Sequence, residues 1–278
     1  MIRKVVELEP ELVDQAAELI LRNDAYRRYC FPTCEDTKQI ATALLKPTSE
    51  WRSVVQDRVL AIFSIDRSIK RLSNLCIQSG AGELVVSEIL SGLSVIEANS
   101  PLELADVWTR HGFQKGVTQV QFFRKPQESN IIQLLPLTNP TGSDLQAISK
   151  LMVEVYSGRY MDAKDAEKHL RNIVNAKDFL NDCSFISSAR DQVVSACLVC
   201  GSQVKAEVVE LLTHPLYRAR RFAYTELSMA MNRLLKRRVA ELWATVDSEN
   251  KVAVRLFSKR GFTEVARTVE MKNESLRV

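Results

Sequence analysis

Three arginines follow an apolar strand-like run, and their spacing suits the binding of an anion. The run Glu207–Thr213 predicts a buried strand, His214 and Pro215 predict a turn, and a helix is expected from 222 to about 237. The first turn of a helix leaves backbone N–H groups without acceptors, and the helix dipole favours negative charge there. The sequence therefore predicts a phosphate-bearing ligand at this helix start, beside Arg218, Arg220 and Arg221.

Two alternatives accompany this prediction. The arginines could form a solvated basic turn between strand and helix, or mark a degenerate site that has lost its ligand. The cations at the far end of the helix need no ligand, because positive charge suits a helix C-terminus. They are Lys236, Arg237 and Arg238.

The segments after this helix repeat a known order. A second strand is expected at 240–246, followed by a helix that begins near Asn250 and ends at Gly261-Phe262. This order resembles the core of the GCN5-related N-acetyltransferase (GNAT) superfamily over about 131–275. The residues on the family pattern are Arg218, Ala223, Asn250, Ala253, Leu256, Gly261 and Phe262. Two positions depart from it: Arg221 stands where glycine is usual, and Phe257 where tyrosine is usual.

The resemblance implies acetyl-CoA as cosubstrate and assigns residues to it. The pyrophosphate would lie at the loop and helix start, and Asn250 would cap its own helix and could also contact the cofactor. The backbone of the preceding strand would bind the pantetheine arm and the thioester carbonyl. The implied cofactor-binding residues are Leu211, Leu212, Thr213, Arg218, Arg220, Arg221, Phe222, Ala223 and Asn250.

The resemblance also calls for a group that moves a proton from the amine. Glu207 and Glu210 lie on the strand that would face the thioester, and an index difference of three predicts opposite faces of the sheet. We therefore expect Glu210, nearer the reaction centre, to be the base; the alternative is a surface carboxylate paired with a cation. Phe257 cannot protonate a thiolate. Tyr156, Tyr160, Tyr217, Tyr224 and solvent remain open as the acid, and His214 is expected at the surface.

A second copy of the pattern occurs upstream. Pro101–Phe113 aligns without gaps on Asn250–Phe262, and a strand is expected after each Gly-Phe, at Val117–Phe123 and Glu264–Met271. We predict an α/β (α+β) protein of two tandem GNAT-like domains, at 1–126 and 131–278. Each domain is expected to be a mixed, largely antiparallel sheet flanked by helices, and the polar segment 126–130 is the expected linker.

The first domain is expected to shape the substrate site rather than to catalyse. Its loop Gln78–Gly82 has glycines, but no cation follows until Arg110. The reverse arrangement, with the cofactor in the first domain, remains an alternative.

The other elements follow from periodicity and caps. Strands are expected at Leu72–Gln78, Ser94–Ala98, Ile131–Leu137, Phe185–Ala189 and Val193–Cys200. Helices are expected at Glu83–Leu93, at Ser143–Ser157 with Ser143 as N-cap, and from Asp162 to Ala176.

Composition limits the class of protein. A net charge of +4 over 278 residues gives no argument for nucleic acid, and no apolar run approaches the roughly 20 residues that cross a membrane. The N-terminus does not read as a signal peptide, so the cytoplasm is the expected compartment. Six cysteines are then expected as free thiols, and the Cys197/Cys200 pair as strand residues rather than metal ligands.

The sequence thus predicts an N-acetyltransferase that uses acetyl-CoA and a primary amine of a small molecule. Part of the pattern also resembles bacterial β-lysine acetyltransferases. A binding or scaffold protein that kept the fold without the activity is one alternative. Transfer of a longer acyl group from acyl-CoA or a carrier protein is another.

Overall fold

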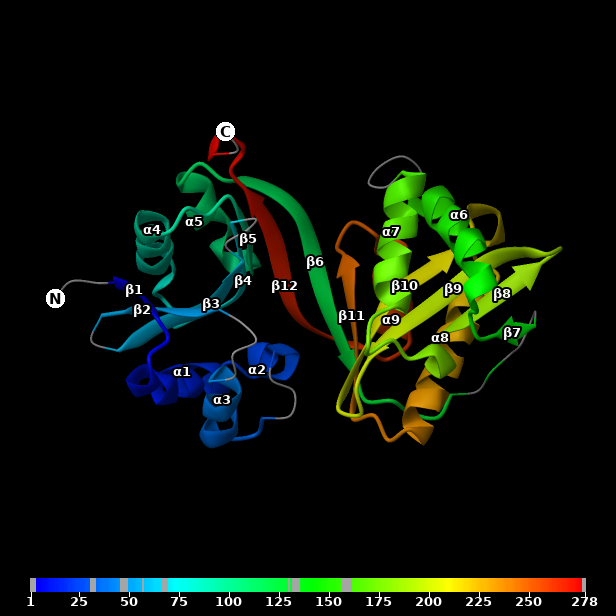
Figure 1. The fold of residues 1–278 in the computed structure, drawn as a ribbon, viewed down its shortest axis with the longest axis horizontal. Helices are drawn as coiled ribbons and strands as arrows, with labels where there is room; N and C mark the ends of the chain where they lie inside the picture. Colours follow the sequence, from blue (N-terminus) through cyan, green and yellow to red (C-terminus); the bar gives the residue numbers. More distant parts are fainter. Residues whose placement is uncertain are drawn as a thin grey trace. The chain divides into compact units, whose positions relative to one another are not determined.

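In the computed structural model the chain forms two compact units, each an open mixed sheet with helices (Figure 1). The structure describes residues 4–30, 34–45, 50–56, 58–66, 70–129, 131, 136–156 and 162–276. The first unit contains residues up to Gln121 together with 246–254 and 264–278, and the second contains 122–245 and 255–263. Among the described residues, no helix combines the length and apolar character needed to cross a membrane.

The first unit has the strand order β1-β2-β3-β4-β5-β12-β6. Its helices include an amphipathic α1, whose buried face carries Val13, Ala16 and Ile20. The elements are β1 (Lys4–Glu7), α1 (Pro10–Arg22), α2 (Asp24–Cys30), α3 (Thr37–Leu44), β2 (Trp51–Val55), β3 (Val59–Asp66), β4 (Arg71–Ile77), α4 (Gly82–Gly92), β5 (Glu97–Pro101), α5 (Ala105–Arg110), β6 (Gln114–Arg124) and β12 (Thr263–Lys272).

The second unit has the strand order β6-β11-β10-β9-β8-β7, with β6 shared between the units. Its remaining elements are β7 (Leu137–Thr138), α6 (Leu145–Tyr156), α7 (Ala163–Val174), β8 (Phe185–Ala189), β9 (Gln192–Gly201), β10 (Lys205–Thr213), α8 (Phe222–Lys236), β11 (Glu241–Asp247) and α9 (Lys251–Lys259).

Helices cover both faces of the second sheet (Figure 1). On one face α6 and α7 pack on β8, β9 and β10, and this core includes Ile148, Leu170 and Leu212. On the other face lies α8, whose Glu226 reaches Ser187 and Ser195 on β8 and β9. Neighbouring residues along a strand point to opposite faces of the sheet. Since helices cover both faces, every residue of Val193–Val199 is buried.

Each sequence half contributes a strand to the other unit. β12, the last strand of the chain, pairs antiparallel with β5, placing Thr268 opposite Pro101 and Lys272 opposite Glu97. Residues 122–124 at the end of β6 belong to the second unit, where β6 neighbours β11. The compact units are thus not contiguous in sequence, and the division into 1–126 and 131–278 stays a prediction about the repeat.

The predicted element types in 70–124 and 185–272 are confirmed. The fold class is also confirmed: the strand pairs are largely antiparallel, and β4–β5 and β10–β11 are parallel. The strand expected at Ser94–Ala98 lies later, as β5. Ser143 is not the N-cap of its helix, because Thr141 forms a capping box with Asp144 one turn earlier. Residues 132–135, 157 and Tyr160 lie outside the described residues.

Candidate active site

The second sheet opens between β10 and β11. Their parallel pairing covers only Lys205–Val208 against Glu241–Ala244, although β10 continues to Thr213. Beyond Val208, β10 keeps its pairing with β9 alone. The predicted residues Leu211, Leu212 and Thr213 therefore lie along a strand edge that β11 does not occupy. Leu212 has its side chain in the core, 1% exposed, so only its backbone is available at this edge.

A β-bulge at the start of this opening changes which face of the sheet the following side chains of β10 point to. Opposite β9, Val208 pairs with Val199 and Glu210 with Leu198, so Val209 is an extra residue. Glu207 lies opposite Cys200, two residues from Leu198, so Glu207 and Glu210 share one face of the sheet. The expectation that they face opposite sides is wrong, because the bulge shifts the alternation by one residue.

The two carboxylates are distinguished by their partners instead. Glu207 accepts a hydrogen bond from Thr245 Oγ1 at 3.1 Å. Glu210 is 7% exposed and accepts from Tyr156 Oη at 2.7 Å through Oε2, while its Oε1 lies 2.9 Å from His169 Nε2. Each carboxylate oxygen has two lone pairs, so Glu210 keeps capacity for a further proton donor.

Glu210 sets the electrostatics of its two partners. Its hydrogen bond raises the pKa of His169 and favours an imidazolium beside the carboxylate. The pKa of Tyr156 is also raised, first by burial and then by the charge of Glu210. Tyr156 is therefore a neutral hydrogen-bond donor at any physiological pH. This arrangement fixes the Glu210 carboxylate between Tyr156 and His169, whose side chain is 44% exposed.

The basic turn follows β10. After a short 3-10 turn at Pro215–Tyr217, the chain enters α8 through Ala219 and Arg221, at φ of 61° and 67°. Glycine adopts this left-handed conformation without cost, which accounts for the family preference at the Arg221 position. Phe222, 6% exposed, anchors the start of the helix in the core.

The start of α8 offers positive potential without an acidic partner. It has no side-chain cap and no acid in its first turn. Arg220 lies over the Tyr217 ring at 5.4 Å, and Arg218 Nε is 3.4 Å from the Thr213 carbonyl oxygen. None of the ion pairs formed by the described residues includes Arg218, Arg220 or Arg221. The predicted anion site is therefore an exposed cationic turn at a helix N-terminus, directly after the open edge of β10.

Asn250 and Phe257 have structural roles in the structure. Asn250 Oδ1 accepts a hydrogen bond from the Ala253 backbone N–H at 3.1 Å and so caps α9, as expected. Phe257, 2% exposed, stacks on Phe122 at 5.8 Å and meets Phe262 edge-on at 5.0 Å. The ring at the family tyrosine position is thus packed among aromatic neighbours.

His214 also forms a contact that sequence reasoning did not anticipate. Its Nε2 lies 2.9 Å from Glu154 Oε2, while Nδ1 accepts from the Leu216 backbone N–H. This places the imidazole between α6 and the basic turn. Among the described residues, no group of three His, Cys, Asp or Glu side chains could hold a metal ion. Among the described residues, the six cysteines form no disulfide.

His169 and Glu226 are the polar residues that sequence reasoning missed. His169 follows the buried Ala166 by three positions and precedes Ile173 by four, so helical spacing places a titratable group on the apolar stripe of α7. Glu226 likewise sits among the buried residues of α8, and burial raises its pKa to about 8. A charged residue at a core-facing helix position was the available signal for both.

Comparison with known proteins identifies this second unit. Residues 145–262 match the model of the Acetyltransferase (GNAT) family. No curated protein sequence gives a significant match.

Solved structures match nearly the whole chain at low identity, which shows a shared fold. A GCN5-related N-acetyltransferase from Sphaerobacter thermophilus superposes with a TM-score of 0.62 at 15% identity, covering 97% of this chain and 94% of that one. A GNAT-family acetyltransferase from Colwellia psychrerythraea gives 0.57 at 12%, covering 99% and 100%. A tandem GNAT protein from the clavulanic acid biosynthesis pathway gives 0.53 at 12%, covering 97% of each chain. The resemblance inferred from the sequence is therefore confirmed: residues 145–262 match the GNAT acetyltransferase family, and these solved structures share the fold of nearly the whole chain.

Proposed function

We propose that the second unit transfers the acetyl group of acetyl-CoA to a primary amine of a small molecule. The family implies acyl-CoA-dependent acyl transfer. The identity of the acyl group, the acceptor and the site residues are our proposal. The amine nitrogen attacks the thioester carbonyl carbon, the C–S bond breaks, and the amine loses a proton while the thiolate gains one.

The observation that carries the proposal is the contrast between two equivalent helix starts. At α8 the first turn has no acid and follows three arginines without ion-pair partners among the described residues. At α4 in the first unit the first turn contains Glu83, which bonds Arg110 and lies 3.5 Å from His111. A carboxylate at α4 opposes a pyrophosphate. We therefore assign the pyrophosphate to Arg218–Ala223.

The glycines of the first loop have local structural explanations: Gly80 adopts a φ of 80°, and Gly82 packs closely on Leu104. A Cβ built on Gly82 would approach Leu104 Cδ2 to 2.6 Å, so a larger residue at this position would displace the Leu104 side chain. The reverse arrangement, with the cofactor in the first unit, stays the alternative that the titration below distinguishes. An inactive binding protein would bind acetyl-CoA without releasing free CoA in the presence of any amine. An acetyltransferase would release free CoA as it acetylates the amine.

In the proposed reaction, Glu210 is the base. A buried carboxylate attracts an ammonium group and accepts its proton, leaving the neutral amine that can attack. Tyr156 and His169 hold the carboxylate in place. Leu211, Leu212 and Thr213 would contact the pantetheine arm and the thioester through backbone groups at the open edge of β10.

Calorimetric titration with acetyl-CoA tests the cofactor site. The double variant Arg218→Ala/Arg221→Ala should weaken binding by about 2–4 kcal/mol, from the loss of two charge-assisted hydrogen bonds of about 1.5–3 kcal/mol each with imperfect additivity. Lys236→Ala, at the opposite end of α8, is the matched control and should leave the affinity unchanged. Equal affinity for acetyl-CoA in the double variant and the control would show that the pyrophosphate does not bind at this turn.

A steady-state assay of CoA release with a panel of primary amines tests the chemistry. Glu210→Gln should preserve acetyl-CoA binding while lowering kcat/KM for the amine on the order of 10²–10⁴-fold, the usual effect of losing a positioned base. The loss should shrink as pH rises, because more of the amine is already neutral. A rate equal to wild type would assign proton removal to water. Competition by butanoyl-CoA distinguishes longer acyl donors.

A further inference from the structure

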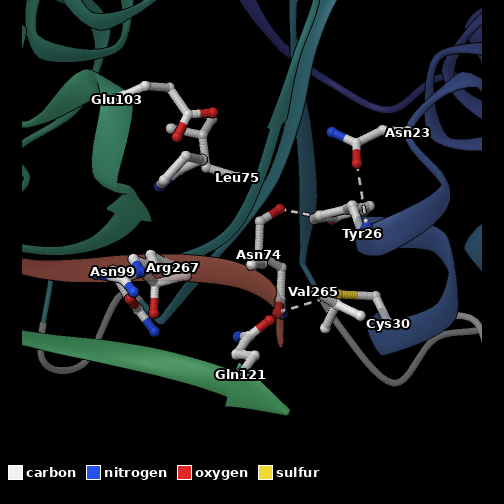
Figure 2. A pocket seen from close by; sticks show the side chains of 13 residues that line it. Asn23, Tyr26, Cys30, Asn74, Leu75, Asn99, Glu103, Gln121, Val265 and Arg267 are labelled. Atoms are coloured by element: carbon white, nitrogen blue, oxygen red, sulfur yellow. Dashed lines mark hydrogen bonds between the residues drawn. The ribbon is translucent and has the colours of Figure 1, made fainter. Parts of the chain in front are cut away.

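The first unit contains a cavity of about 270 Å³ where β4 and β5 separate (Figure 2). The two strands pair only at Arg71–Glu97 and Leu72–Ala98. Beyond these residues the strands diverge, and α2, β6 and β12 supply further walls. The polar lining residues include Tyr26, Asn74, Asn99, Gln121 and Thr268.

Specific contacts fix the conformation of β4 where it diverges from β5. Opposite β3, Ser73 pairs with Ser64 and Cys76 with Ile62, so β4 carries one extra residue at 74–75. Asn74 adopts a φ of 54°, a left-handed conformation that asparagine tolerates better than most residues. Tyr26 Oη donates to the Asn74 carbonyl oxygen at 2.6 Å, and Asn74 Nδ2 donates to Ser64 Oγ at 3.0 Å. Such backbone conformations are retained where the surroundings fix them, often at ligand sites.

Two polar atoms of the lining are buried without a hydrogen-bond partner among the described residues. They are Asn99 Oδ1 on β5 and Thr268 Oγ1 on β12. In the β5–β12 pairing, Asn99 lies opposite Glu270, two residues beyond Thr268. Asn99 and Thr268 are therefore diagonal neighbours on one face, about 7–8 Å apart. The opposite face is in the core with Ala98, Val269 and Met271. Buried unpaired groups are rare and costly, so two together indicate a missing partner.

The interior of the cavity is neutral and amide-rich. Asn74, Asn99 and Gln121 contribute carboxamides, and Gln121 is only 6% exposed. The two charged lining residues, Glu103 and Arg267, are exposed, and Arg267 Nε is bonded to Glu264 at 2.6 Å. Since a net charge in such an interior would have no buried partner, the cavity selects an uncharged ligand.

We propose that this cavity is a second small-molecule site, which takes a small neutral carboxamide. The ligand N–H donates to Asn99 Oδ1, its carbonyl oxygen accepts from the Thr268 hydroxyl, and its short aliphatic part lies against Leu75 and Val265. One planar group whose donor nitrogen and acceptor oxygen are bonded to the same carbon satisfies both unpaired atoms. This site is distinct from the α8 turn and independent of the proposed acetyl transfer.

Titration of the full-length protein with butanamide, followed by NMR without acetyl-CoA, tests the proposal. Butanoate and butylamine match the probe in size and differ in charge. We expect saturable binding of butanamide alone. Thr268→Val, nearly isosteric, should weaken it about tenfold by removing one buried hydrogen bond. Asn99→Leu should abolish it. Ser53→Ala, which removes another buried unpaired hydroxyl outside the cavity lining, should leave it unchanged.

Several outcomes overturn the proposal. These are no binding of butanamide, equal binding of all three probes, or an affinity that Thr268→Val leaves intact. Coenzyme A also carries amides in its pantetheine arm. An affinity for coenzyme A that drops in Thr268→Val but survives Arg218→Ala/Arg221→Ala would assign the cavity to that arm instead. Melting temperature without ligand controls for folding: Thr268→Val loses an unpaired hydroxyl and should be at least as stable as wild type.

Discussion

Replacing Glu226 by glutamine should remove a pH dependence that is built into the second unit. Glu226 is fully buried, and the Ser187 hydroxyl donates to its Oε1 at 2.7 Å. Ser195 Oγ lies 2.8 Å from Oε2 and 2.7 Å from the Leu212 carbonyl oxygen. A hydroxyl has one hydrogen, so Ser195 cannot donate to both. A protonated Glu226 resolves this, because it donates to Ser195 while Ser195 donates to Leu212.

The magnitude follows from the pKa of Glu226, which burial raises from 4.5 to about 8. An acid with a higher pKa in the folded state binds more protons when folded, so stability falls as pH rises between the two values. The slope is about 1.4 kcal/mol per pH unit. By pH 7 this group therefore costs roughly 3 kcal/mol, and above pH 8 roughly 5 kcal/mol, relative to stability below pH 4.5.

Urea unfolding between pH 5 and pH 9 measures this dependence. Glu226→Gln keeps the acceptor for Ser187 and a donor for Ser195, but its second N–H is buried unpaired, at a cost of about 1–3 kcal/mol. The two proteins should therefore differ little near pH 6–7. At pH 9 the variant should be more stable by roughly 2–4 kcal/mol. The exposed Glu249→Gln is the control for a general charge effect. Parallel curves for wild type and Glu226→Gln would refute the assignment of a neutral Glu226.

Three further variants test other features of the second unit. Arg221→Gly should raise stability by about 1 kcal/mol, because glycine adopts φ of 67° without strain; a lower melting temperature would show that the arginine side chain contributes packing. Phe257→Tyr should lower stability by about 1–3 kcal/mol, because its hydroxyl enters an apolar cluster with Phe122 and Phe262; unchanged unfolding would show space and a partner there. His169→Gln should keep acetyl-CoA affinity but flatten the pH profile of kcat near neutrality, and a profile identical to wild type would limit His169 to a packing role.

Local patterns predicted the elements that position the site. The apolar run at 207–213, the Pro215 turn and the helical spacing after Phe222 each depend on neighbouring residues, and β10 and α8 lie at those positions. Strand partners depend on the rest of the fold instead. The exchange that pairs β12 with β5 leaves no trace in the sequence, because Thr263–Lys272 alternates in the same way whichever neighbour it pairs with.

The bulge in β10 shows that the argument by which Glu210 was selected as the candidate base was wrong, while the role of Glu210 stays a prediction. The regular alternation of side chains along a strand predicted that Glu207 and Glu210 lie on opposite faces, and proximity to the turn then favoured Glu210. The extra residue at Val209 returns both carboxylates to the α6–α7 face. What separates them is tertiary: Thr245 bonds Glu207, whereas Tyr156 and His169 enclose Glu210. β4 carries a similar extra residue where it leaves β5, beside the cavity of the first unit. In both units the extra residue lies where the parallel pairing ends. The bulge that makes the alternation of side chains unpredictable from the sequence therefore also marks the place where the sheet opens.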